Sequence, residues 1–190
     1  MPLRHSLNEL YKLKPSNMKT KNLIIAAVCC LFSLPLLSQD HGNRELTKAL
    51  VALDGLIGEW EGEGYIINQQ QERITFKQHE MIYYDLDSNI IMVEGKGMSG
   101  ERIVHDARAI ISPSDSANHF EFYSFLAGGR KGKFTMIKSE NEINWYIDVP
   151  NGEIKYTITL KDDEYHEIGQ FGSGGQWYPF MEMNLKRIGD

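Results

Sequence analysis

Acidic side chains that interrupt apolar segments are the residues of this sequence best suited to chemistry inside a cavity. Glu94 lies in the segment IIMVEGKG, Glu182 in PFMEMNL and Glu167 in EIGQF. A carboxylate removed from water needs a partner or acquires a raised pKa, which suits it to hold a polar ligand or to transfer a proton. For Glu94 and Glu182 the alternative is a structural ion pair with Arg108 or Arg130, and the sequence leaves both interpretations open.

Other chemical motifs are incomplete. The segment GKGMSG at 95–100 has the spacing of a dinucleotide fingerprint, but a predicted strand follows it, so no helix N-terminus is available for a pyrophosphate. The segment GGRKG at 128–132 lacks the ending of a phosphate-binding loop and predicts a hairpin turn with a basic tip. His166-Glu167 resembles half of a metalloprotease motif without its second histidine, and no serine lies in a nucleophile elbow. The sequence therefore predicts no metal site and no serine nucleophile.

An apolar segment near the beginning of the chain indicates export. Residues 23–37, LIIAAVCCLFSLPLL, follow Lys19 and Lys21 and precede a polar stretch. A basic region, a short apolar region and a polar exit are typical of a secretory signal peptide, whereas a membrane span needs about 20 apolar residues. We expect translation to start at Met18 and cleavage to follow Ser38, which gives a periplasmic or secreted protein.

The predicted domains are an N-terminal extension with signal peptide at 1–38 and one folded domain at 39–190. Both cysteines, Cys29 and Cys30, lie in the first segment, so the predicted mature chain has no disulfide and no membrane span. The whole chain has a net charge of -6, and residues 1–38 hold five basic side chains and one acidic one, which leaves -10 on 39–190. Such an acidic body repels phosphate backbones, so we expect no binding of nucleic acid.

The mature chain is predicted to contain one short helix and then only strands. Apolar residues spaced by three and four predict a helix over 43–53, with Asn43 as N-cap and Gly55 as its end. Beyond Gly58 the apolar period changes to two. The predicted strands are 59–68, 72–84, 89–98, 101–112, 118–126, 131–139, 143–149, 153–161, 164–172 and 176–188.

The connections between these strands are too short for crossover helices, so the strands are expected to pair antiparallel. Asn151-Gly152 is the strongest hairpin signal among them. An antiparallel meander of ten strands leaves two unpaired edges unless it closes on itself. The predicted fold is therefore all-β, an up-and-down barrel of about ten strands with one short N-terminal helix, and a two-sheet sandwich is the alternative.

The segment GEWEGEG opens the first predicted strand. Strand alternation places Glu59, Glu61 and Glu63 on a solvated outer face, opposite Trp60, which is expected to plug one end of the barrel. This Gly-x-Trp opening resembles that of the calycins, which include lipocalins, fatty-acid-binding proteins and nitrobindins. The chain is more similar still to a family of uncharacterised, often exported bacterial lipocalin-like proteins. The segments that carry the resemblance are LIGEWEGEG, VEGKG, VHDARAIIS, FYSFLAGGR, EIGQF and FMEMNLKR.

The resemblance implies a ten-stranded barrel with an internal cavity and no established reaction. Nitrobindin-like relatives bind heme through a histidine on the final strand. Here that strand has no histidine, and Glu182 stands near the ligand position, so only His166 or Met183 could replace the axial ligand. No cofactor is predicted, and heme is disfavoured.

The expected function is that of a binding module for a small apolar or amphipathic molecule held in the lumen. The alternatives are an enzyme, such as an isomerase or hydrolase that uses lumen carboxylates, and a barrel without ligand that serves structure or interaction. His166 and Glu167 cannot form a catalytic pair in one lumen, because adjacent strand residues face opposite sides. The oligomeric state is left open. The residues expected to line the lumen are Trp60, Glu80, Glu94, Tyr123, Phe125, Glu167, Trp177 and Glu182.

Overall fold

The computed structural model describes residues 48–190. The predicted signal peptide, its cleavage after Ser38 and the predicted helix start at Asn43 lie outside the described residues. Residues 48–50 are helical and continue into the 3-10 helix η1 (Val51–Leu56), which runs past the predicted end at Gly55. The strands are β1 (Gly58–Ile67), β2 (Arg73–Asp85), β3 (Ile90–Ser99), β4 (Arg102–Pro113), β5 (His119–Leu126), β6 (Lys131–Lys138), β7 (Ile143–Val149), β8 (Gly152–Lys161), β9 (Glu164–Ser173) and β10 (Gln176–Gly189).

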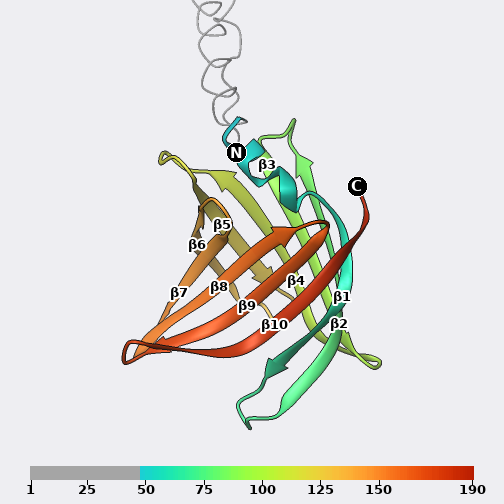
Figure 1. Ribbon diagram of the computed structural model, residues 1–190, viewed down its shortest axis with the longest axis vertical. Coiled ribbons are helices and arrows are strands. Elements are labelled where there is room, and N and C mark those ends of the chain that lie inside the picture. Colours follow the sequence, from blue (N-terminus) through green and yellow to red (C-terminus); the bar gives the residue numbers. More distant parts are fainter. Residues whose placement is uncertain (1–47) are drawn as a thin grey trace, which may run out of the picture. The chain divides into compact units, whose positions relative to one another are not determined.

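The ten strands form a closed antiparallel barrel in which each strand pairs with its neighbours in sequence and β1 pairs with β10. Figure 1 shows this meander, with the short helix beside the end at which β1 begins. The predicted barrel is confirmed, and the alternative of a sandwich is wrong, because the β1–β10 pairing leaves no free sheet edge. No predicted strand end differs from the observed one by more than one residue.

Tight turns set this register. Asn151, between β7 and β8, has φ of 69°, and Asp162 and Asp163, between β8 and β9, have φ of 49° and 62°. Asn and Asp tolerate this left-handed region better than other side-chain-bearing residues, so they suit short hairpin connections. The hairpin predicted from Asn151-Gly152 is confirmed.

The hydrophobic core fills the end of the barrel that η1 covers. The indole of Trp60 is 1% exposed, and its Nε1 donates a hydrogen bond of 2.9 Å to the carbonyl of Leu56, which ties the helix to β1. The Trp60 ring packs against Tyr165, with 5.6 Å between ring centroids. The other fully buried core residues include Leu50, Leu53, Ile91, Ile111, Phe120, Met136, Ile143 and Leu185. Trp60 thus plugs this end, as predicted.

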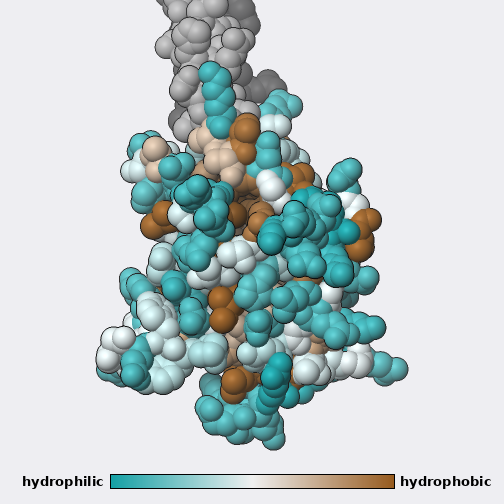
Figure 2. Space-filling model, viewed as in Figure 1, coloured by the Kyte–Doolittle hydropathy of each residue, from teal (hydrophilic) through white to brown (hydrophobic). Residues whose placement is uncertain are grey.

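The visible outer face of the barrel is largely hydrophilic and carries scattered apolar side chains (Figure 2). Glu61 and Glu63 are exposed, as the alternation along the first strand predicts, and Glu59 is half-buried and contacts His79. Within residues 48–190, no helix is long and apolar enough to cross a membrane.

Candidate functional site

The interior of the barrel holds a cavity of about 840 Å³ beyond the plugged end. Its lining extends to the opposite end, where it includes Ile66 at the end of β1, Arg130 in the β5–β6 turn and Ile154 at the start of β8. Cavities that bind small molecules usually measure about 300–1,000 Å³ and combine apolar walls with a few polar groups. The barrel cavity has that size.

Aromatic side chains form one wall of the cavity. The rings of Trp145 on β7 and Tyr156 on β8 are stacked, with centroids 4.0 Å apart and planes 6° apart. Phe122 contacts Trp145 at 4.8 Å, and Phe180 meets Tyr156 edge-on at 5.9 Å. We call these four residues, together with Phe134, the aromatic wall. Such a surface can bind an apolar body and also attract a cation to its ring faces.

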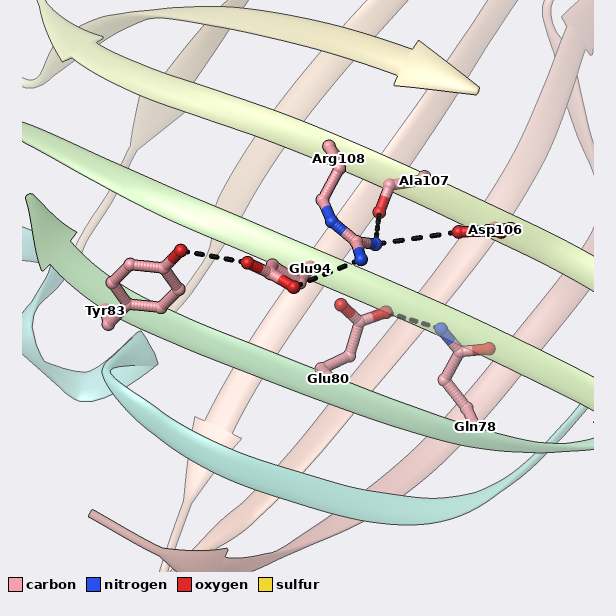
Figure 3. Close-up of polar contacts among 7 residues, drawn as sticks. All are labelled: Gln78, Glu80, Tyr83, Glu94, Asp106, Ala107 and Arg108. Atoms are coloured by element: carbon pink, nitrogen blue, oxygen red, sulfur yellow. Dashed lines mark hydrogen bonds and ion pairs between the residues drawn. The ribbon is translucent and has the colours of Figure 1, made fainter. Parts of the chain in front are cut away.

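Two polar side chains of β2 enter the same cavity. Every second side chain of β2 faces the interior, and Gln78 and Glu80 are two of these. Only 2% and 5% of their surfaces are exposed. The amide Nε2 of Gln78 donates a hydrogen bond of 2.6 Å to Oε1 of Glu80 (Figure 3). The amide oxygen of Gln78 is buried and has no hydrogen-bond partner among residues 48–190. The pair therefore presents unused acceptor capacity inside the barrel.

Glycines on the neighbouring strand make room for this pair. A Cβ placed on Gly95 of β3 would lie 2.6 and 2.7 Å from the two carboxyl oxygens of Glu80, and one on Gly97 would lie 2.5 Å from Oε1 of Gln78. Carbon and oxygen cannot approach that closely without repulsion, so a side chain at either glycine would displace the polar group opposite. The glycines of the segment VEGKG thus shape the cavity wall opposite Glu80 and Gln78.

A second carboxyl group, Glu167 on β9, also lines the cavity and is 6% exposed. Its Oε2 accepts a hydrogen bond of 3.2 Å from the hydroxyl of Tyr165, and its Oε1 accepts a longer one of 3.4 Å from Nε1 of Trp145. The Trp145 bond connects Glu167 to the aromatic wall. Both of its oxygens are therefore engaged by the protein, in contrast to Glu80.

Burial controls the ionisation of both groups. Loss of hydration raises the pKa of Glu80 from 4.5 to about 8, an effect that the negative charge of Glu167 reinforces and that the Gln78 hydrogen bond and the charge of Arg108 oppose. Burial raises the pKa of Glu167 to about 7, against the two hydrogen bonds that it accepts. No ion pair joins either carboxyl to a cation within residues 48–190. At neutral pH, Glu80 accordingly retains its proton.

The structure brings two of the eight predicted lumen residues, Glu80 and Glu167, into the cavity wall. Trp60 is inside the barrel but belongs to the plug. The other five do not line the cavity, so their predicted position is wrong. Phe125 and Trp177 are 43% and 40% exposed. The remaining three, Glu94, Tyr123 and Glu182, take part in contacts on the outer face.

The outer contacts explain these carboxylates. Oε2 of Glu94 lies 3.1 Å from a guanidinium nitrogen of Arg108, and its Oε1 accepts a hydrogen bond of 2.9 Å from Tyr83. Figure 3 shows these contacts separate from the Gln78–Glu80 hydrogen bond. The ion pair with Arg108 that the sequence offered as an alternative is therefore confirmed. Oε1 of Glu182 pairs with Nε2 of His166 at 3.0 Å. Neither Glu94 nor Glu182 reaches the lumen, because each is adjacent in its strand to residues that face inward, and neighbouring side chains of a strand point to opposite faces.

Histidine placement bears on the question of heme. His166, which pairs with Glu182, is on the outer face, whereas Met183 lines the cavity. Of the two replacement ligands named from the sequence, only Met183 faces the lumen, and the inward residues of β10 do not supply an imidazole there. The residues present do not reproduce a final-strand histidine site, and the expectation of no heme stays a prediction. His105 on β4, which we did not anticipate, also lines the cavity, and burial lowers its pKa.

The described part of the chain offers no evident metal site, and it has a second, smaller hollow. Within residues 48–190, no group of three or more His, Cys, Asp or Glu side chains is arranged to hold a metal ion. A smaller hollow of about 420 Å³ has both polar and apolar residues in its lining, and its charged residues include Glu63, Arg73 and Glu182. It does not contain the carboxyl groups with raised pKa, so the barrel cavity is the stronger candidate.

Comparison with known proteins gives a likeness of fold. No family model matches the chain, and no curated protein matches it. Rv2717c from M. tuberculosis has a similar structure, with a TM-score of 0.60 and 14% identity over 75% of this chain and 98% of that one. The S-type phycobiliprotein lyase CPES from Guillardia theta has a TM-score of 0.51 and 9% identity over 79% and 96% of the two chains. Together with the closed ten-stranded barrel, these neighbours fit a calycin-like barrel fold.

Proposed function

We propose that the protein binds a small, partly apolar molecule in its barrel cavity. The observation that carries the proposal is the combination of about 840 Å³ of interior space with the aromatic wall and the buried polar groups Gln78, Glu80 and Glu167. A barrel whose role is purely structural gains stability by filling its interior with apolar side chains, whereas buried carboxyl groups without paired cations lower it. Their presence beside open space supports ligand binding.

Nile red, an uncharged apolar dye that fluoresces more strongly in apolar surroundings, provides a direct test on the full chain. We expect saturable binding with a stoichiometry near one. Substitution Ala107→Trp narrows the cavity, because Ala107 lies on its wall, and we expect it to weaken dye binding at least tenfold. Ile110→Trp is the matched control, because Ile110 is on the same strand but not in the lining.

Both variants keep the N-terminal apolar segment, so a dye that binds there gives the same signal in each. Equal dye binding by Ala107→Trp and the unsubstituted protein, or no saturable binding by the unsubstituted protein, would contradict the proposal. Native mass spectrometry of protein purified from a periplasmic extract supplies a second readout, in which we expect a reproducible adduct of small mass.

An enzyme is the second candidate function, and the raised pKa values of Glu80 and Glu167 favour it. Carboxyl groups that titrate near neutral pH are suited to general acid and base catalysis. One structural neighbour, CPES, is named a phycobiliprotein lyase. Turnover of the bound molecule, lost in Glu80→Gln while dye binding persists, would favour this alternative. We also propose that the chain is an exported bacterial lipocalin-like protein, on the basis of its signal-like segment at 23–37 and its motifs.

A further inference from the structure

The inner face of β2 offers hydrogen-bond acceptors to the cavity. Oε1 of Gln78 has no partner within residues 48–190 although the side chain is only 2% exposed. Oε2 of Glu80 receives no hydrogen bond from the same residues, so it is an open acceptor once the carboxyl group ionises. An unpaired buried acceptor costs about 1–3 kcal/mol, and a ligand that donates hydrogen bonds removes this cost. The cavity is therefore complementary to a donor.

The charged groups around the cavity further restrict the class of ligand that can bind. Glu80 and Glu167 are both buried at the cavity, and the negative charge of Glu167 disfavours ionisation of Glu80. The cations of the lining, Arg130 and Lys131, are exposed residues of the β5–β6 region, where solvent screens them. Arg108 is on β4 and is paired with Glu94 on the outer face. A positively charged ligand would thus supply the partner that the buried carboxyl groups lack.

The surroundings of the carboxyl groups suit an organic cation. Trp145 donates a hydrogen bond to Glu167 and is stacked on Tyr156, so the aromatic wall begins next to a carboxyl group. Aromatic faces attract ammonium groups and also pack against hydrocarbon. A bare metal ion is less suitable, because the described residues 48–190 contain no cluster of three metal-ligating side chains.

We infer that the ligand of the cavity is an amphipathic amine, whose protonated nitrogen donates hydrogen bonds to Glu80 and Gln78 and whose apolar body packs on the aromatic wall. This inference rests on the proposed binding function and names the ligand class. The space that Gly95 and Gly97 leave for the two acceptors indicates that this part of the wall is shaped around them. Binding exchanges one cation for another, because Glu80 releases its proton to solvent when the ammonium group, which keeps its own protons, takes the adjacent position.

Three ligands with the same naphthalene body test the inference: 1-naphthylmethylammonium, uncharged 1-naphthylmethanol and anionic 1-naphthylacetate. Each is titrated against the full chain loaded with Nile red at pH 7.0. We expect the ammonium compound to displace the dye at least tenfold more effectively than the alcohol, and the acetate to be weakest. Calorimetry of the ammonium compound in two buffers with different heats of protonation should detect proton release on binding.

Glu80→Gln removes the charge and nearly preserves the shape of the side chain. We expect this variant to bind the ammonium compound and the alcohol within twofold of each other and to release no proton. Glu94→Gln is the matched control, because it removes an outer-face carboxylate one strand away. It should preserve the tenfold preference.

The outcomes separate the two proposals. If Nile red and the alcohol bind but the ammonium compound has no advantage, or if Glu80→Gln retains that advantage, the amine inference is wrong and the binding function stands. If neither Nile red nor any naphthyl compound binds, the binding function itself is contradicted.

Discussion

The guanidinium carbon of Arg187 on β10 lies 4.1 Å from the ring centroid of Trp60 on β1. Arg187 also donates hydrogen bonds to the carbonyls of Ile57 and Gly55 and to a carboxyl oxygen of Asp163, the last at 2.9 Å. One side chain therefore connects both strands of the closing pair, the segment after η1 and the β8–β9 turn. The same contacts that complete the barrel also seal the end behind the cavity.

Arg187→Ala should accordingly destabilise the barrel. It removes the cation–π contact and the hydrogen bonds that the charged guanidinium group donates. We expect the free energy of unfolding to fall by about 2–3 kcal/mol. Urea denaturation followed by tryptophan fluorescence measures this change. Arg102→Ala, at an exposed position at the start of β4, is the control and should change the free energy by less than about 0.5 kcal/mol. Equal effects of the two substitutions would contradict the sealing role.

Gly95→Ala tests the space reserved for Glu80. The new Cβ would lie under 3 Å from both carboxyl oxygens, and the carboxyl group, as the far end of a flexible side chain, must move away from Gln78. We expect a loss of about 1 kcal/mol of stability from the broken hydrogen bond. Displacement of Nile red by 1-naphthylmethylammonium should weaken at least fivefold.

Gly128→Ala is the matched control for this substitution, because Gly128 also belongs to the cavity lining, in the β5–β6 turn, but a Cβ there meets no atom within 4 Å. It should leave both stability and displacement unchanged. If Gly95→Ala displaces the dye as well as the unsubstituted protein does, then the space at Gly95 is not needed for the site.

Strand order and closure could be predicted because they depend on local signals. The period of two, the turn residues and the short connections each constrain the neighbouring strand, and every observed strand was expected within one residue at each end. The face of a strand is harder to predict. Ile90, Met92 and Val93 surround Glu94 with apolar residues of both faces, so hydrophobicity alone does not reveal that Glu94 points outward.

Irregular pairing has a similar effect on the last strand. The register of β10 against β9 shifts between Pro179 and Met181, and beyond this point Met183 and Leu185 face inward. An alternation counted from Phe180, which lines the cavity, would place Glu182 inward, whereas the shift turns Glu182 outward. For Gln78 and Glu80 the sequence did contain a signal, because glycines in a strand often mark the close approach of another group, and Gly95 and Gly97 lie on the adjacent strand. Its use requires the register of β2 against β3, which the sequence alone does not give.

The predicted export signal gives an independent test. Expressed from Met18 in a Gram-negative host, the chain should appear in the periplasmic fraction, and its N-terminal sequence should begin at Gln39. A variant with Leu23 and Ile24 both changed to Lys interrupts the apolar segment and should remain in the cytoplasm. Periplasmic recovery of that variant, or an unprocessed N-terminus in the original chain, would contradict the prediction.

Stability should also depend on pH through Glu80. The folded-state pKa of about 8 lies above the usual 4.5, so between these pH values the folded state holds more protons than the unfolded state. The free energy of unfolding therefore decreases as the pH rises from about 5 to 8.5. Glu80→Gln removes this contribution, because its amide stays uncharged throughout.

At pH 5 the variant Glu80→Gln and the unsubstituted protein should have similar stability. At pH 8.5 the variant should be more stable by roughly 4 kcal/mol, since the folded-state pKa of Glu80 lies about three units above pH 5 and one pKa unit corresponds to about 1.4 kcal/mol. Urea denaturation at several pH values gives both curves. Glu94→Gln is the matched control, because it removes a carboxylate on the outer face of the neighbouring strand. A difference between the Glu80→Gln and unsubstituted curves that stays constant over this pH range would show that Glu80 ionises normally, and the exchange of its proton for an ammonium group would then have no basis.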